Sequence, residues 1–114
     1  MNAMVSLTNT NDGYHEEVLS ENIESRNCFT YVDNHGSNCE MCIYEDGLCF
    51  FKETEDYLLE LHLRINNYAK ITTKEGTVRI EVKVLDFIYN SDISIMRYLI
   101  DDEERIIRIE FIGV

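Results

Sequence analysis

The sequence predicts an all-β fold, an antiparallel meander that closes into a small barrel, and two patterns indicate it. The first is a two-residue alternation of apolar and polar side chains, seen over Tyr57–Ile65 and again over Val78–Val84. An alternation of this period gives a strand one dry face and one wet face. The second is the series of short polar turns between such segments, which is typical of consecutive hairpins.

The N-terminal quarter of the chain has the weakest pattern. Residues 1–13 are rich in Asn and Thr and show no clear period, so we expect a loose leader there and a single barrel domain over residues 14–114. Residues 14–27 allow two interpretations. Tyr14, Val18 and Ile23 could line a short acidic helix that starts near Asp12, whereas His15–Leu19 could be a polar strand, which is the interpretation that we favour.

From Cys28 onward, strand signals follow one another with turn residues between them. Asp33–Gly36 is a cluster of turn formers, and Asp46-Gly47 is a dipeptide that tolerates positive φ in a tight hairpin. The predicted strands are Cys28–Val32, Asn38–Tyr44, Leu48–Glu53, 57–67, Tyr68–Thr73, Thr77–Phe87, Ile93–Ile100 and Arg105–Gly113.

The length of these strands favours a barrel over a flat sheet. Ten extended residues span about 33 Å, and long strands twist and coil. Closure of such a sheet removes its exposed edges. The apolar alternation also slips by one residue near Val84-Leu85, which predicts a bulge or a sharp bend at that point.

Residues 40–114 resemble a known family. The matching features are Glu45–Gly47, the segment Tyr68–Val82 with its turn Gly76, and a final strand, acidic turn and strand that end at Gly113. In these features the chain is similar to the YwiB-like family of bacterial calycin-like barrels. The resemblance implies a calycin- or lipocalin-like barrel. It implies no established reaction and supplies no catalytic residues.

Charge narrows the range of partners. The formal net charge is −12, and residues 1–60 hold 13 of the 22 acidic residues but only Arg26 and Lys52 as bases. A surface this negative repels phosphate backbones and anionic lipid, so we expect neither nucleic acid nor a membrane as a partner. The charge could recruit a basic partner, but it more often keeps a small domain in solution.

The predicted location is cytoplasmic. Residues 1–13 lack the basic and apolar regions of a signal peptide, and nowhere do 18 apolar residues run together. In the cytoplasm we expect the four cysteines to be thiols rather than disulfides.

Cys39-Glu40-Met41-Cys42 suggests a zinc site, but the strand pattern argues against it. Residues three apart in a strand point to opposite faces, so Cys39 and Cys42 would not converge on one ion. We therefore expect small buried thiols, with no metal and no cofactor. Stoichiometric zinc in an elemental analysis would contradict this expectation.

The last hairpin suggests a candidate anion site. A loop of two or four residues within Asp101–Glu104 would place Arg97 directly opposite Arg108. Like charges that face each other are unfavourable unless something negative lies between them. A bound anion is one possibility; a neighbouring carboxylate, or simple exposure of both side chains to water, is the other.

Three classes of function follow from these patterns. The leading hypothesis is a non-catalytic module that binds a small apolar ligand inside the barrel. The alternative is a protein-interaction or homo-oligomeric role through Ile93–Ile100, which is apolar on both faces and so needs an outer cover. An enzyme is the least favoured class, because we find no triad, metal spacing or carboxylate pair.

Overall fold

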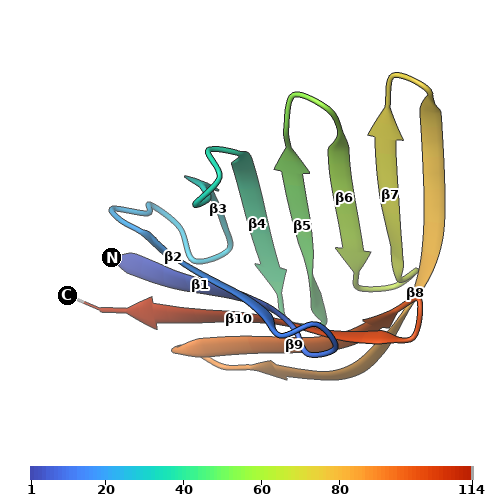
Figure 1. Cartoon of the computed structure of the whole chain (residues 1–114). Helices are drawn as coiled ribbons and strands as arrows, with labels where there is room; N and C mark the ends of the chain where they lie inside the picture. The colour runs from blue at the N-terminus through green and yellow to red at the C-terminus, as the bar shows by residue number, and fades with distance from the viewer. Residues whose placement is uncertain (114) are drawn as a thin grey trace.

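The structure is a computed structural model that describes residues 1–113, and over these residues it is an antiparallel all-β fold of ten strands (Figure 1). This confirms the predicted fold class. The strands are β1 (Asn2–Asn9), β2 (Tyr14–Ser20), β3 (Cys28–Val32), β4 (Asn38–Tyr44), β5 (Gly47–Glu53), β6 (Leu58–Leu63), β7 (Tyr68–Thr73), β8 (Gly76–Tyr89), β9 (Ile93–Ile100) and β10 (Glu103–Ile112).

The N-terminal residues are part of the sheet, so the prediction of a loose leader over residues 1–13 is wrong. Strand β1 pairs with β10 along its full length and with β2 on its other side. Ala3 and Val5 point inward and are almost fully buried. The alternation is weak because the apolar Met4 fills the outward position between them and the polar Asn9 fills an inward one. Residues 14–20 form a strand rather than a helix.

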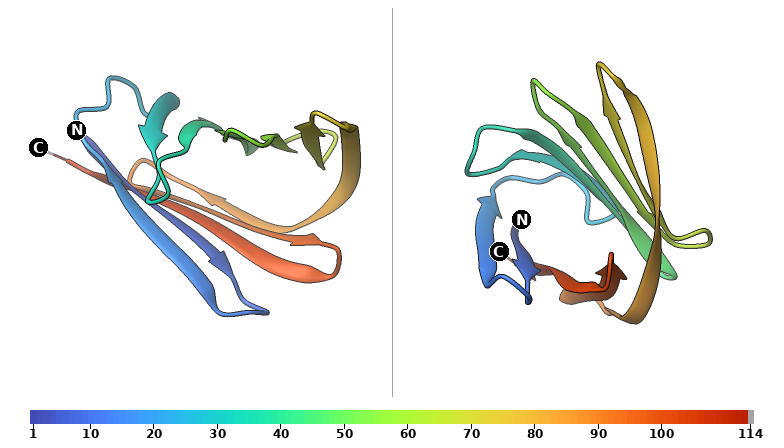
Figure 2. Two further views of the ribbon diagram at one scale, coloured as in Figure 1. Left: turned by 45° about the horizontal axis from the view of Figure 1, so that its top comes forward. Right: turned by 45° about the vertical axis from the view of Figure 1, so that its right-hand side comes forward.

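Strand β8 carries the chain from one half of the barrel to the other (Figure 2). Its first half pairs with β7 and its second half with β9, and the register shifts between Val84 and Asp86. This confirms the bulge predicted from the slip in alternation. Figure 2 shows β8 bending between the two groups of strands, so the bulge lies on the strand that turns the sheet.

The barrel is nearly closed rather than fully closed. The sheet runs in the order β2-β1-β10-β9-β8-β7-β6-β5-β4-β3, which leaves β2 and β3 as its two edges. Side chains connect the edges: the Asn34 amide donates to the Glu17 carbonyl at 3.1 Å, and the Tyr14 hydroxyl lies 3.4 Å from His35 Nε2. We call this junction the β2–β3 seam.

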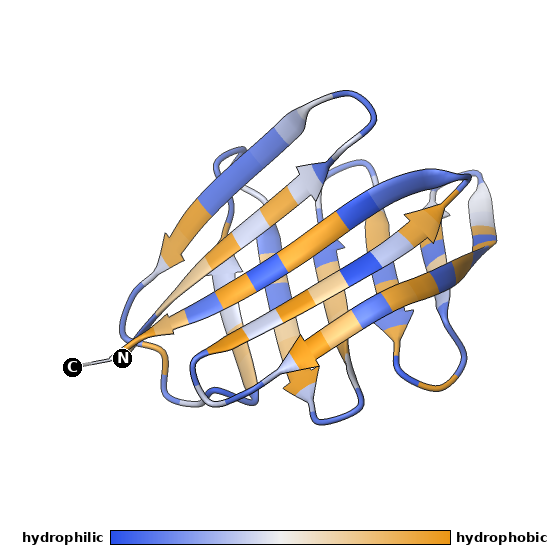
Figure 3. Cartoon of the chain, turned by 90° about the horizontal axis from the view of Figure 1, so that it is seen from below, coloured by the Kyte–Doolittle hydropathy of each residue, from blue (hydrophilic) through white to orange (hydrophobic). Residues whose placement is uncertain are grey.

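The core lies between the two halves of the sheet and takes alternate side chains from most strands, whereas β7 and β8 each contribute one buried residue, Ala69 and Val82. Figure 3 shows the resulting bands of hydrophobic and hydrophilic residues along the strands. The largest fully buried apolar side chains come from both halves and are Met41, Leu48, Leu63, Met96, Ile107, Ile109 and Val5. Within the described residues we find no helix of the length and apolar character needed to cross a bilayer.

Candidate ligand-binding cavity

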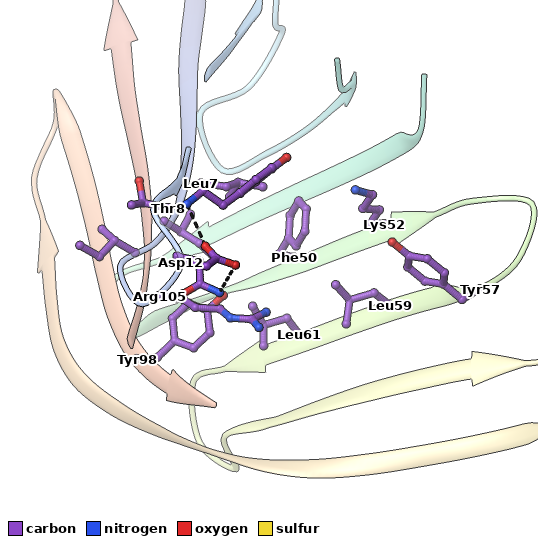
Figure 4. Close-up of a pocket in the computed structure, with 14 residues that line it drawn as sticks. Leu7, Thr8, Asp12, Phe50, Lys52, Tyr57, Leu59, Leu61, Tyr98 and Arg105 are labelled. Carbon is purple, nitrogen blue, oxygen red and sulfur yellow. Dashed lines mark hydrogen bonds between the residues drawn. The ribbon is translucent and has the colours of Figure 1, made fainter. Parts of the chain in front are cut away.

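A cavity of about 360 Å³ opens between the two halves of the barrel. Its walls come from β1, β2, β5 and β6, and from β9 and β10, together with Asp12 and Tyr57 from the adjoining turns. The apolar part of the lining consists of Leu7, Phe50, Leu59, Leu61, Tyr98, Ile106 and Ile107. Figure 4 shows Phe50, Leu59 and Leu61 side by side on the wall formed by β5 and β6.

Polar groups lie toward the two ends of this apolar wall. Lys52 and Tyr57 lie toward one end, and Arg105, Asp12 and Tyr98 toward the other (Figure 4). Asp12 is already engaged, since it accepts the Tyr14 backbone N–H at 2.8 Å. Arg105 Nη2 donates to Glu103 at 3.3 Å, but its buried Nε has no hydrogen-bond partner among residues 1–113. Arg105 therefore has an unpaired donor, which a rotation of the guanidinium would present to a ligand.

A buried ion pair fixes the Lys52 end of the cavity. Lys52 Nζ lies 3.0 Å from Asp33 Oδ2, and the Asp33 side chain is 1% exposed. The other oxygen of Asp33 accepts the backbone N–H groups of His35 and Ser37, each at 2.9 Å. Burial alone would raise the pKa of Asp33, but these two N–H donors and Lys52 outweigh it and hold the pKa below its ordinary value.

Two neutral polar groups, the Cys39 thiol and the Tyr31 hydroxyl, lie near Asp33 outside the cavity lining. Cys39 Sγ lies 3.9 Å from Asp33 Oδ2, and burial together with the Asp33 charge raises the pKa of this thiol to about 11. Burial also raises the pKa of Tyr31 far above its ordinary value. Both groups keep their protons at neutral pH. Cys39 therefore lacks the thiolate that a cysteine nucleophile requires.

Glu16 is a buried carboxylate on the β2 side of the β2–β3 seam. It lies on β2, its side chain is 4% exposed, and its Oε2 has no hydrogen-bond partner among the described residues. The His35 ring on the opposite edge lies nearby, with Nε2 3.8 Å from Glu16 Oε2. Glu16 and His35 thus lie close together across the β2–β3 seam.

The structure separates the predicted anion-binding pair from this cavity. Arg97 pairs across the hairpin with Ile106, and Arg108 pairs with Ile95, because the turn consists of Asp101 and Asp102 alone. The two arginines are therefore not directly opposite, and that part of the prediction is wrong. Each has its own carboxylate: Arg97 Nε lies 3.1 Å from Glu104, and Arg108 Nη2 lies 3.2 Å from Glu110.

Anion binding by Arg97 and Arg108 stays a prediction. Both side chains point to the outer face and are a little under half exposed. If they form a site, titration with inorganic phosphate will show weaker binding for both Arg97→Ala and Arg108→Ala than for the unmodified protein. Equal phosphate binding by all three proteins would contradict an anion site at Arg97 and Arg108.

The expectation of four thiols is wrong for two cysteines. Cys28 and Cys42 are joined by a disulfide, while Cys39 and Cys49 are free. The disulfide follows from the pairing of β3 with β4, which sets Cys28 directly opposite Cys42. The opposite orientations predicted for Cys39 and Cys42 hold: Cys39 lies in the core cluster and Cys42 lies on the outer face with Cys28.

Sequence reasoning missed Asp33, Lys52 and Glu16, although a signal was present for two of them. Lys52 has the same parity as the buried Leu48 and Phe50, and Asp33 continues the parity of Phe29 and Tyr31. A charged residue in an inward position of a strand is uncommon and marks a polar group that needs a partner. Glu16 had no comparable signal because its strand has few apolar residues.

The comparisons with known proteins add little to this geometry. No model of a known family matches the chain, and no curated protein matches it. Among solved structures, the chain is similar to the crystal structure of the ywiB protein from Bacillus subtilis. The match covers 98% of this chain and 91% of that chain, at 13% identity and a TM-score of 0.41. A likeness at this level carries no argument, so membership of the calycin-like family stays a prediction.

Proposed function

We propose that this protein is a binding module whose cavity takes a small apolar ligand with a negatively charged end. The observation that carries the proposal is the cavity of about 360 Å³ with an apolar wall and a cation toward each end. Small-molecule sites are commonly about 300–1,000 Å³, apolar, and equipped with a few polar groups that fix orientation. The cavity has these properties.

The polar groups favour an anionic end over a cationic one. Lys52 and Arg105 both line the cavity of a protein whose net charge is −12. Lys52 is paired with Asp33 and Arg105 with Glu103, but the buried Nε of Arg105 has no partner among the described residues. A carboxylate at the Arg105 end would satisfy that donor with a charge-assisted hydrogen bond. The hydrocarbon part would lie along Phe50, Leu59 and Leu61.

Three probes of equal chain length test the charge preference. We expect decanoate to raise the melting temperature more than decan-1-ol, and decylamine to raise it least. Arg105→Gln should weaken decanoate binding by about tenfold or more, because a hydrogen bond to a charged group contributes about 1.5–3 kcal/mol. Binding of decan-1-ol should hardly change. Calorimetric titration measures both affinities.

A pair of tryptophan variants tests the location. Leu59→Trp should fill the cavity and abolish decanoate binding, whereas Ile95→Trp, on the outer face of β9, should leave it unchanged. The proposal fails if none of the three probes shifts the melting temperature and native mass spectrometry of the purified protein finds no retained ligand. It also fails if Leu59→Trp binds decanoate as tightly as the unmodified protein.

A second candidate function is self-association through Ile93–Ile100, and one observation favours it. The outward residues of β9 include Ile93, Ile95 and Leu99, and Ile88 beside Ile95 is 45% exposed. A second copy of the chain would cover this apolar row. We expect Ile95→Glu to convert a dimer to a monomer in sedimentation equilibrium. An unmodified protein that sediments as a monomer at micromolar concentration would contradict this role.

A further inference from the structure

Three cysteines form a row across the outer face of β3, β4 and β5. Cys28 is the register partner of Cys42, and Cys42 is in turn the register partner of Cys49. Directly opposed residues in an antiparallel pair have Cα atoms about 4.5–5.5 Å apart, and disulfides span about 4.4–6.8 Å. Cys42 is therefore placed to bond with either neighbour. In the structure it is bonded to Cys28, and Cys49 is free.

A histidine continues the row on β6. His62 is the register partner of Cys49, and its Nδ1 lies 3.8 Å from Cys49 Sγ. Its Nε2 lies 3.8 Å from Glu60 Oε1, which favours a proton on Nε2 and leaves Nδ1 as an acceptor. The ring stacks on Tyr68, with centroids 4.7 Å apart, and meets Phe51 edge-on. These contacts hold Nδ1 toward the thiol.

We propose that this row is a thiol–disulfide exchange site for small-molecule disulfides of the glutathione type, in which Cys42 pairs alternately with Cys28 and Cys49. In the internal step the Cys49 proton passes to His62 Nδ1 and Cys49 Sγ attacks Cys42 Sγ. The Cys42–Cys49 bond forms, the Cys28–Cys42 bond breaks, Cys28 leaves as a thiolate, and His62 releases the proton to solvent. No net oxidation or reduction occurs.

The external step uses the released Cys28. Its thiolate attacks one sulfur of the small-molecule disulfide, whose S–S bond breaks. Cys28 forms a mixed disulfide with one half, and the other half leaves as a thiolate that takes a proton from solvent. Cys28 is exposed on an edge strand, whereas Cys42 is 7% exposed, so of these two bonded sulfurs Cys28 is the one that an external molecule can reach. Cys49 is half-buried, and it is the thiol that oxidised glutathione reaches in the Cys28→Ser variant.

The surroundings of Cys49 explain why a proton acceptor is needed. Burial raises the pKa of Cys49 above its ordinary value, so the group is a neutral thiol at pH 7 without assistance. Cys39 takes no part, because it belongs to the core cluster on the inner face. The row is also separate from the ligand cavity, so this proposal does not rest on the proposed function.

Disulfide mapping tests the alternate pairing. The reduced protein is oxidised with oxidised glutathione, free thiols are blocked with iodoacetamide, and the chain is cleaved after glutamate. Cleavage after Glu24, Glu40, Glu45 and Glu53 isolates Cys42 in residues 41–45 and Cys49 in residues 46–53. Residues 25–40 hold both Cys28 and Cys39, so a link from this peptide is assigned to Cys28 only where it persists in Cys39→Ala. Mass spectrometry then identifies which peptides are linked.

We expect the unmodified protein to yield two linked pairs, 25–40 with 41–45 and 41–45 with 46–53. Cys28→Ser should yield only the second pair, and Cys39→Ala, the matched control, should yield both. If Cys42 and Cys49 are both blocked by iodoacetamide in Cys28→Ser, alternate pairing is overturned. The same holds if the unmodified protein never yields the second pair.

A kinetic measurement tests the role of the histidine as a positioned proton acceptor. We expect His62→Gln to slow formation of the Cys42–Cys49 bond in the Cys28→Ser background by about tenfold or more at pH 7. His15→Gln, on the outer face of β2, should react at the unmodified rate. Equal rates for His62→Gln and His15→Gln would overturn the assignment of His62.

Discussion

Replacement of Asp33 with Ala is expected to lower the free energy of unfolding by about 3–5 kcal/mol at pH 7. The change leaves Lys52 in a largely buried position without its partner at 3.0 Å. It also removes the acceptor of the His35 and Ser37 backbone N–H groups, which close the turn after β3. Urea unfolding followed by circular dichroism measures the loss.

The same carboxylate makes stability depend on pH. The folded pKa of Asp33 lies below the ordinary value of 3.8, so its contribution is fully present above that value and is lost as pH falls through the folded pKa. Asp33→Asn should therefore show a smaller loss of stability than the unmodified protein between pH 5 and pH 2.

A surface aspartate supplies the control for Asp33. Asp46 accepts from Arg64 Nε at 2.9 Å, but both side chains are more than a third exposed. Exposed ion pairs contribute little to stability because water and salt screen them. Asp46→Ala should therefore destabilise the protein far less than Asp33→Ala. Equal losses for the two variants would show that the buried Asp33–Lys52 pair contributes no more to stability than an exposed ion pair.

Replacement of Gly47 with Ala is expected to lower the free energy of unfolding by about 2–3 kcal/mol, near the upper end of the range for overpacked sites. A Cβ at this position would lie 2.0 Å from the Leu63 carbonyl oxygen and 3.0 Å from Arg64 Cα. Both contacts are with backbone, so relief requires a movement of the end of β6. Thermal or urea unfolding of the variant measures the cost.

Gly113→Ala is the matched control, because a Cβ there meets no atom within 4 Å. Its effect should be within about 0.5 kcal/mol. A Gly47→Ala variant as stable as Gly113→Ala would contradict the close approach of β5 to the end of β6. The sequence predicted that Gly47 is needed for a positive φ in the turn. The glycines with positive φ are instead Gly13, Gly36 and Gly76, and Gly47 is needed because a side chain would not fit there.

Much of the sheet could be predicted from the sequence because alternation and turn residues are local signals. The predicted bounds of Cys28–Val32, Asn38–Tyr44, Tyr68–Thr73 and Ile93–Ile100 agree with the observed strands. The segment 57–67 was drawn too long, since β6 ends at Leu63 and Ile65 is 81% exposed in the following turn. Strand β1 was missed because its pairing with β10 joins opposite ends of the chain.

The candidate site was less predictable because it depends on register between strands. Alternation places Lys52 and Asp33 on inward faces, but only the pairing of β3, β4 and β5 brings them to 3.0 Å. In the predicted register of the last hairpin Arg108 lies opposite Arg97. In the observed register, which differs by two residues, Arg108 lies opposite Ile95. The same dependence on register explains why the Cys28–Cys42 pair was not foreseen.

The central claim is that the interior of the barrel, rather than its outer face, receives the ligand. Methyl-resolved NMR of the protein titrated with decanoate tests it most directly. We predict that chemical shifts change for Leu7, Leu59 and Leu61 on the cavity wall, and that Ile93 and Ile95 on the outer face stay unchanged. Shifts confined to the outer-face methyl groups, or no shifts at saturating decanoate, would contradict the claim.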